Sequence, residues 1–258
     1  MHGWDFSVLE GSMTCGEPDW DFEAECRGAL AALADAGGGT VLDMGTGGGE
    51  RLALLLGSLD AGRRGRLDVV ATEGWERNVP VARERLEPLG VRVEEHDPER
   101  GDPLPLPDGG VRLVMNCHEA LDARDLARVL APGGLLITQQ VDDAGAPGTP
   151  DIPVASEVPG TPGTRGRLDV RASRPSVRLR AMTVALSEAG LIVESTSQWS
   201  RAVDVDSADE LAADWGSVHP GAPGPDRAAV LARIREESGG GPVLLVARRF
   251  CIRARRPS

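Results

Sequence analysis

Two short stretches of the chain carry residue types that can bind or transform a ligand. The first, Thr40–Gly57 (TVLDMGTGGGERLALLLG), runs through an apolar strand to Asp43 and then has four glycines within positions 45–49. Because glycine has no Cβ, such a turn lets the backbone approach a ligand closely. The second stretch, NCHEALD, holds His118 and Glu119. An imidazole that titrates near neutral pH beside a carboxylate is suited to proton transfer or to binding a cation.

The glycine turn does not fit two common phosphate-binding patterns. A dinucleotide fingerprint that starts at Gly45 would place Glu50 against the pyrophosphate at a helix N-terminus, which is electrostatically unfavourable. A P-loop requires a lysine, and all 28 basic residues of this chain are arginines. A cationic nucleoside ligand without phosphate fits the turn better. A tight strand-to-helix turn without a ligand is the alternative, but it would not need so many glycines.

The elements that must position these residues alternate between apolar strands and helices. The expected strands are Thr40–Met44, RLDVVATE ending at Glu73, VRVEEH, VRLVMN and GLLITQQV, with residues of helical period between most of them and Asp122 as a helix cap. This order predicts parallel pairing with right-handed crossovers. A last long strand, GPVLLVARRFCIRARR, is expected to have Phe250 and Ile252 on one face and to expose the face that holds Arg249 and Cys251.

Three signatures in this order resemble those of the class I S-adenosylmethionine-dependent methyltransferases. VLDMGTGGG resembles motif I of that family, with its acid at Asp43 and glycines at 45, 47 and 49. Glu73, in VVATEGW, is similar to the acid that ends the family's second strand, and LAPGGLLI (Leu130–Ile137) resembles its turn into the fifth strand. The resemblance covers about residues 38–140. It implies one α/β domain with a Rossmann-like, seven-stranded, mostly parallel sheet, helices on both faces and an antiparallel last strand.

The resemblance implies that the cofactor is S-adenosylmethionine and that the product is S-adenosylhomocysteine. Asp43 would organise a backbone cradle for the methionine end, and Glu73 would accept hydrogen bonds from both ribose hydroxyls. The cofactor contacts implied on matching positions are Asp43, Gly45, Thr46, Gly47, Glu73, Gly74, Trp75, Asp97, Asn116 and Cys117. Trp75 would pack on the adenine, with a core position as its alternative, and Asp102 competes with Asp97 for the adenine amino group.

His118 and Glu119 are the catalytic candidates, because the resemblance places the end of the fourth strand beside the transferable methyl group. Methyl transfer is an in-line displacement at an activated carbon, so positioning can supply most of the rate. His118 would deprotonate a hydroxyl or an amine, and Glu119 would orient His118 or bind a cationic substrate. A hydrogen-bonded structural role is the alternative for His118.

The composition narrows the choice of partners. The net charge of −12 disfavours nucleic acid and would suit a cationic or neutral small-molecule acceptor. The four cysteines show no spacing typical of a metal site or a disulfide framework, so no metal is expected. The start of the chain does not resemble a signal peptide, and no apolar run approaches the roughly 18 residues of a membrane span, so we expect a cytoplasmic protein away from membranes. The oligomeric state stays open, with a homodimer among the options.

We expect a single domain over residues 1–258. It would consist of an N-terminal helical lid (1–36), a cofactor-binding half (37–141), a Pro/Gly-rich loop (142–176) and a substrate-side half (177–258). The expected function is transfer of a methyl group from S-adenosylmethionine to an oxygen or nitrogen of a small molecule, in secondary metabolism. The alternatives are methylation of RNA or protein, and a protein that binds the cofactor for other chemistry. The sequence does not identify the acceptor.

Overall fold

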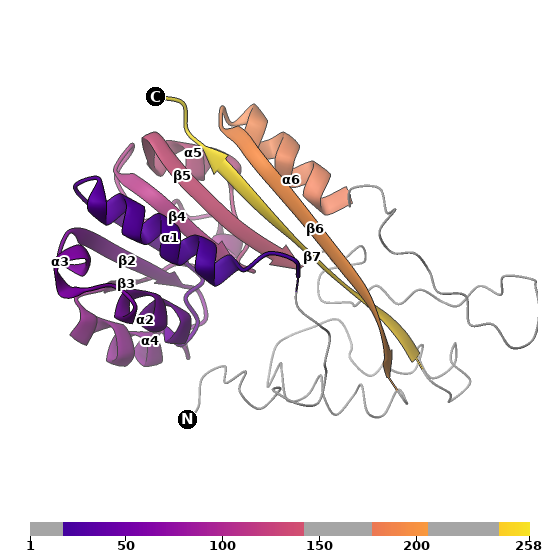
Figure 1. Cartoon of the computed structure of the whole chain (residues 1–258), viewed down its shortest axis with the longest axis horizontal. Helices are drawn as coiled ribbons and strands as arrows, with labels where there is room; N and C mark the ends of the chain where they lie inside the picture. Colours follow the sequence, from indigo (N-terminus) through magenta and orange to yellow (C-terminus); the bar gives the residue numbers. More distant parts are fainter. Residues whose placement is uncertain (1–17, 142–176, 206–242) are drawn as a thin grey trace, which may run out of the picture.

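A computed structural model describes residues 18–141, 177–205 and 243–258, in which seven strands form one sheet of order β3-β2-β1-β4-β5-β7-β6 (Figure 1). The strands are β1 (Gly39–Met44), β2 (Leu67–Glu73), β3 (Arg92–Glu95), β4 (Val111–Cys117), β5 (Leu130–Val141), β6 (Ile192–Val205) and β7 (Val243–Arg255). Strands β1 to β5 pair in parallel, whereas β7 runs antiparallel to β5 and β6. The predicted fold class is confirmed.

Helices cover both faces of the sheet. They are α1 (Phe22–Asp35), α2 (Glu50–Gly57), α3 (Ala61–Arg64), α4 (Val79–Leu86), α5 (Ala123–Val129) and α6 (Val177–Glu188), with short 3-10 turns η2 (Glu87–Leu89) and η3 (Pro98–Arg100). Apolar residues of α1, α2 and α4 form one core with the sheet, and those of α5 and α6 form the other. Asp122 caps α5 as predicted, since its carboxylate accepts the N–H of Asp125 at 2.8 Å.

The N-terminal helix is part of the core. Cys26, Leu30 and Ala34 of α1 are fully buried, and in Figure 1 the helix crosses the face of the sheet at β4 and β5. The lid predicted for residues 1–36 stays a prediction, because residues 1–17 lie outside the described part of the chain. The Pro/Gly-rich segment 142–176 and residues 206–242 of the predicted substrate-side half also lie outside it.

The predicted exposed face of the last strand is wrong at Cys251. Phe250 and Ile252 are buried in the core of α5 and α6, but Cys251 is only 5% exposed and belongs to the opposite core. The reason is topological: β7 inserts between β5 and β6, so α1 can cover the face that the alternation alone would leave to solvent.

Among the helices of the described residues, none has the length and apolar character of a membrane span.

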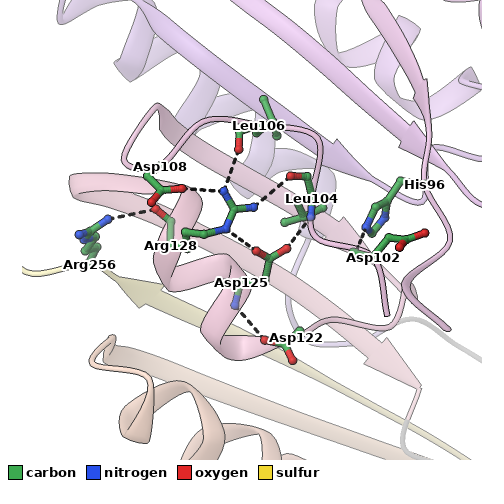
Figure 2. Close-up of polar contacts among 9 residues, drawn as sticks. All are labelled: His96, Asp102, Leu104, Leu106, Asp108, Asp122, Asp125, Arg128 and Arg256. Carbon is green, nitrogen blue, oxygen red and sulfur yellow. Dashed lines mark hydrogen bonds and ion pairs between the residues drawn. The ribbon is translucent and has the colours of Figure 1, made fainter. Parts of the chain in front are cut away.

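Arg128 of α5 holds the long connection between β3 and β4 against the sheet (Figure 2). Its guanidinium donates to the carbonyls of Leu104 (3.0 Å) and Leu106 (2.9 Å) and to the carboxylates of Asp108 (2.8 Å) and Asp125 (2.6 Å). Asp125 also accepts the N–H of Leu104 at 2.6 Å. This connection lies next to the carboxyl end of β3, so its anchoring fixes one wall of the site described below.

Candidate active site

The glycine turn joins the end of β1 to the start of α2. Gly45, Gly47 and Gly49 have φ values of +63°, +63° and +84°, which residues with a Cβ rarely adopt. A Cβ on Gly45 would lie 2.5 Å from the carboxylate of Glu119, and one on Gly49 would lie 2.7 Å from the side chain of Leu86. A Cβ on Gly47 would meet no atom within 4 Å. The backbone at Gly47 therefore borders open space that a ligand can enter.

Glu73 ends β2 beside this turn. Its carboxylate accepts the N–H of Gly47 at 2.7 Å and the N–H of Trp75 at 2.8 Å. Burial raises the pKa of Glu73, while hydrogen bonds from the backbone N–H groups of Trp75, Gly47 and Gly74 and from the side chain of Asn78 act to lower it. Glu73 therefore fastens the glycine turn and presents its acceptor oxygens beside it.

Unpartnered acceptors lie around the same turn. The Oγ1 atom of Thr46 and the Oδ1 atom of Asn78 are buried and have no hydrogen-bond donor within the described residues. Buried polar atoms of this kind are uncommon in folded proteins and call for a partner. Asn78 was missed by the sequence reasoning, which had no pattern to separate it from an ordinary residue before a helix. With Glu73, these oxygens favour a ligand rich in hydrogen-bond donors.

Asp43 lies one strand away from Glu73, half-buried at the end of β1. Burial raises its pKa to about 6, against the opposing effects of a hydrogen bond from the Thr46 side chain and the charge of Arg51, and the negative charge of Glu73 adds to the rise. The folded protein therefore prefers a protonated Asp43 near pH 5. Register pairing places Asp43 opposite Ala71 on β2 and Met115 on β4, in the centre of the carboxyl edge.

Asp43→Asn is expected to remove a pH dependence of stability. The pKa of Asp43 in the folded protein, about 6, exceeds its ordinary value of 3.8. The contribution of Asp43 to the free energy of unfolding is therefore full below pH 3.8 and is lost as the pH rises through 6. The unfolding free energy of the variant should exceed that of the wild type by about 2–3 kcal/mol above pH 7 and match it below pH 4. Urea unfolding at several pH values measures this. Asp68→Asn, at an exposed carboxylate on β2, is the control, and a pH-independent difference for Asp43→Asn would contradict the assignment.

A buried amide network shapes the end of β4. Gln140 of β5 donates from Nε2 to Asn116 Oδ1 at 2.9 Å and to the carbonyl oxygen of Glu119 at 2.9 Å. Asn116 Nδ2 donates to the same carbonyl at 3.1 Å. Asn116 is 0% exposed, so its side chain lies within this network, and its predicted contact with the cofactor stays a prediction. Its side chain faces the core of α5 and α6, where it and Gln140 hold the turn at residues 117–119.

This turn carries His118 in a strained conformation. Among the described residues other than glycine, His118 alone has a positive φ, at +70°, and its N–H donates to the carbonyl of Gln139 at 2.9 Å. Such strain persists only where surrounding contacts enforce it, and it is typical of functional sites. The side chain is solvent-accessible, but the protein packed around it lowers its pKa to about 4, and Arg249, Arg51 and Arg178 lower it further. His118 is therefore neutral at physiological pH.

Glu119 and Cys117 flank His118 on different sides. The Glu119 carboxylate lies over Gly45, so the β4 turn and the glycine turn are in direct contact. The Cys117 thiol faces the core of α1 and lies 3.7 Å from Gln139 Nε2, and burial raises its pKa. Cys26, Cys117 and Cys251 are free thiols, and no described cluster of His, Cys, Asp or Glu could hold a metal ion.

The ends of β2 and β3 enclose the other side of the site. A Cβ on Gly74 would lie 3.1 Å from the Cα of Asp97, so these two strand ends touch. Trp75 is half-buried after Glu73, and Asp97 pairs with Arg100 at 3.3 Å.

A cavity of about 410 Å³ opens at the end of β3, lined among others by Met44, His96, Pro98, Asp102, Leu104 and Asp122. His96 points to the Asp102 carbonyl, 3.0 Å away (Figure 2). Asp102, rather than Asp97, borders this cavity.

Comparisons with known proteins agree with this arrangement at the level of the fold. No family model and no curated protein matches the chain. Among solved structures, a candidate methyltransferase from Bacillus halodurans C-125 is 18% identical, with 90% of this chain and 100% of that chain covered and a TM-score of 0.54. The chain has the class I methyltransferase fold. Two further structures share this fold. A functionally unknown protein from Deinococcus radiodurans R1 is 15% identical, with 95% of this chain and 90% of that chain covered and a TM-score of 0.53. The [4+2]-cyclase SpnF is 18% identical, with 97% of this chain and 90% of that chain covered and a TM-score of 0.52.

Within the methyltransferase fold, the predicted residues fall into three groups. Asp43, Gly45, Thr46, Gly47, Glu73, Gly74, Trp75, His118 and Glu119 gather at the carboxyl ends of β1, β2 and β4. Open α/β sheets bind ligands at this edge. Asp97 lies at the rim of the group, and Asn116 and Cys117 turn toward the two cores. The sequence missed Asn78, and it missed Gln140 and Arg249, whose roles depend on partners far along the chain.

Proposed function

We propose that the protein is an S-adenosylmethionine-dependent methyltransferase that methylates an oxygen or nitrogen of a small molecule. The observation that carries the proposal is the junction of Gly47 and Glu73. An open backbone turn is fastened to a buried carboxylate, and the His118 turn contacts the same loop through Glu119. A nucleoside with a sulfonium-activated carbon needs three features side by side. They are a backbone that it can approach closely, a hydrogen-bond acceptor for its ribose hydroxyls, and an adjacent site for the molecule that receives the methyl group.

The residues present fit this cofactor. Glu73, Thr46 Oγ1 and Asn78 Oδ1 offer acceptors to hydroxyl and amino groups, and a cavity lies at the end of β3, at His96 and Asp102. A phosphate ligand fits poorly, because Glu50 lies at the start of α2, where Arg85 pairs with it. When bound, S-adenosylmethionine supplies a methyl group activated by its sulfonium.

The chain's own contribution to the reaction is positioning and proton transfer. Asn116 and Gln140 hold the His118 turn at the carboxyl end of β4. Neutral His118 can take a proton from the acceptor, although its low pKa makes it a weak base, best matched to an acidic acceptor. Positioning of the acceptor atom then supplies most of the rate.

Calorimetric titration with S-adenosylhomocysteine, with NADH as the comparison ligand, tests the proposal. We expect micromolar or tighter binding of S-adenosylhomocysteine and none of NADH. Transfer of a radiolabelled methyl group from S-adenosylmethionine to small molecules, but not to RNA or protein, would support the acceptor class. Failure to bind S-adenosylhomocysteine would defeat the proposal.

Gly47→Ala is expected to separate ligand binding from folding. Alanine at a φ of +63° costs about 1 kcal/mol of unfolding free energy, and its methyl group meets no protein atom. The same methyl group would project into the ligand's space, so affinity for S-adenosylhomocysteine should fall at least tenfold. Gly90→Ala, at a φ of +81° and also facing open space, is the matched control. It should lose similar stability in urea unfolding and keep its affinity; unchanged binding by Gly47→Ala would place the ligand elsewhere.

A further inference from the structure

Arg249 lies where β5 ends and the sheet narrows to two strands. It is the register partner of Val141, the last residue of β5, and of Trp199 on β6. Within the described part of the chain, the β7 residues before Arg249 pair only with β6, and Figure 1 shows these two strands continuing past the end of β5. Opposed residues of antiparallel strands project to the same face. Arg249 therefore shares the face of Cys251, which is the face that α1 covers.

His118 and Trp20 meet at the same edge through Gln139. The His118 N–H donates to the Gln139 carbonyl at 2.9 Å, and Trp20 Nε1 donates to Gln139 Oε1 at 2.8 Å. Figure 1 shows the chain entering α1 beside the carboxyl end of β5. After burial, the charge of Arg249 is the strongest influence on the His118 pKa, followed by Arg51 and Arg178. The guanidinium charges therefore disfavour the protonated imidazole.

The charge of Arg249 is not balanced within the described residues, where no carboxylate lies within ion-pair distance of it. Arg253 and Arg255, farther along β7 on the same face, both pair with Glu194, at 3.6 and 2.6 Å. Arg249 is half-buried, and a partly desolvated cation without a counter-charge is unfavourable unless an anion joins it. Trp199, the register partner of Arg249, and Trp20, which donates to Gln139, are both half-buried and supply flat apolar surfaces at this edge.

We propose that the methyl acceptor is an aromatic carboxylic acid whose carboxylate is bound by Arg249 next to His118. This inference rests on the proposed methyltransferase function and names the class of its acceptor. It reverses the expectation of a cationic or neutral acceptor, because the net charge of −12 does not describe the local charge at this edge. The guanidinium binds a carboxylate through paired hydrogen bonds, and the aromatic body packs against Trp20 and Trp199.

The experiment compares acids with their amides on the full chain saturated with S-adenosylhomocysteine. The probes are 4-hydroxybenzoate, salicylate, 4-hydroxyphenylacetate and 4-hydroxycinnamate, each with its amide, titrated by calorimetry. At least one acid should bind ten times more tightly than its amide. Arg249→Gln should lose at least tenfold in affinity for that acid and keep its affinity for the amide and for S-adenosylhomocysteine. Arg248→Gln, the next residue on the opposite face of β7, is the control and should behave as the wild type.

A second measurement tests the placement of Arg249 without any acceptor. The pKa of His118, followed by NMR, should rise in Arg249→Gln and stay unchanged in Arg248→Gln. If S-adenosylhomocysteine binds but no acid exceeds its amide, or if Arg249→Gln leaves both acid affinity and the His118 pKa unchanged, the inference is wrong. If S-adenosylhomocysteine itself does not bind, the proposed function fails instead, and the two failures are distinguishable.

Discussion

Glu73→Gln is expected to lower the affinity for S-adenosylhomocysteine about 100-fold, which corresponds to about 2.7 kcal/mol. Hydrogen bonds to a charged acceptor contribute roughly 1.5–3 kcal/mol each, and the carboxylate would serve both ribose hydroxyls. The substitution also affects the protein, because the N–H groups of Gly47 and Trp75 both donate to this carboxylate. A glutamine must turn its NH₂ group toward one of these donors, so the glycine turn loses an acceptor as well.

The control for this variant lies three residues away. Glu76 is an exposed carboxylate in the same connection between β2 and α4, so Glu76→Gln changes the net charge equally. It should leave the affinity within twofold of the wild type by calorimetric titration. Equal affinities of wild type and Glu73→Gln would show that Glu73 fastens the glycine turn and has no part in ligand binding.

Local patterns made the centre of the site predictable. The glycine turn can be recognised in the sequence because closely spaced glycines indicate a backbone conformation that other residues avoid. Gly45, Gly47 and Gly49 all have a positive φ. Glu73 was predictable because it ends the apolar run of β2 where the resembled family has an acid, and the carboxyl ends of β1 and β2 meet in a parallel pair. Both signals lie within a few residues of the chain, so no knowledge of long-range packing is needed.

The parts that depend on distant pairing could not be predicted in the same way. Asn116 and Gln140 meet only because β4 and β5 pair in one register, and nothing local marks an asparagine at a strand end as buried. The unpaired charge of Arg249 depends on where β5 stops relative to β7, and the burial of Cys251 depends on α1. The left-handed His118 has no sequence signal either, since its N–H donates to the Gln139 carbonyl and Gln140 donates to the carbonyl of Glu119, both on the neighbouring strand β5.

His118→Asn is expected to lower turnover by about 10²–10³-fold, in the usual range for a general base, while affinity for S-adenosylhomocysteine stays within threefold. Asparagine tolerates positive φ, so this change removes the proton acceptor and keeps the turn. Because the folded pKa of about 4 is below the ordinary 6.5, the neutral imidazole persists as the pH falls. Wild-type turnover should therefore hold from pH 7.5 to about 5 and fall only near pH 4. A rate that falls through pH 6.5 would contradict the low pKa.

Measurements of the free energy of unfolding distinguish the backbone strain at His118 from the role of its side chain in proton transfer. The φ of +70° favours glycine, so His118→Gly should have an unfolding free energy about 1 kcal/mol above that of His118→Ala, as urea unfolding measures. Both variants lack the imidazole and should be equally slow. If His118→Ala instead retained most of the turnover, with stability reduced as expected, the side chain would be a structural element and positioning alone would account for the rate. Equal stability of the two variants would mean that the turn relaxes once the imidazole is removed, and that Asn116 and Gln140 do not hold it.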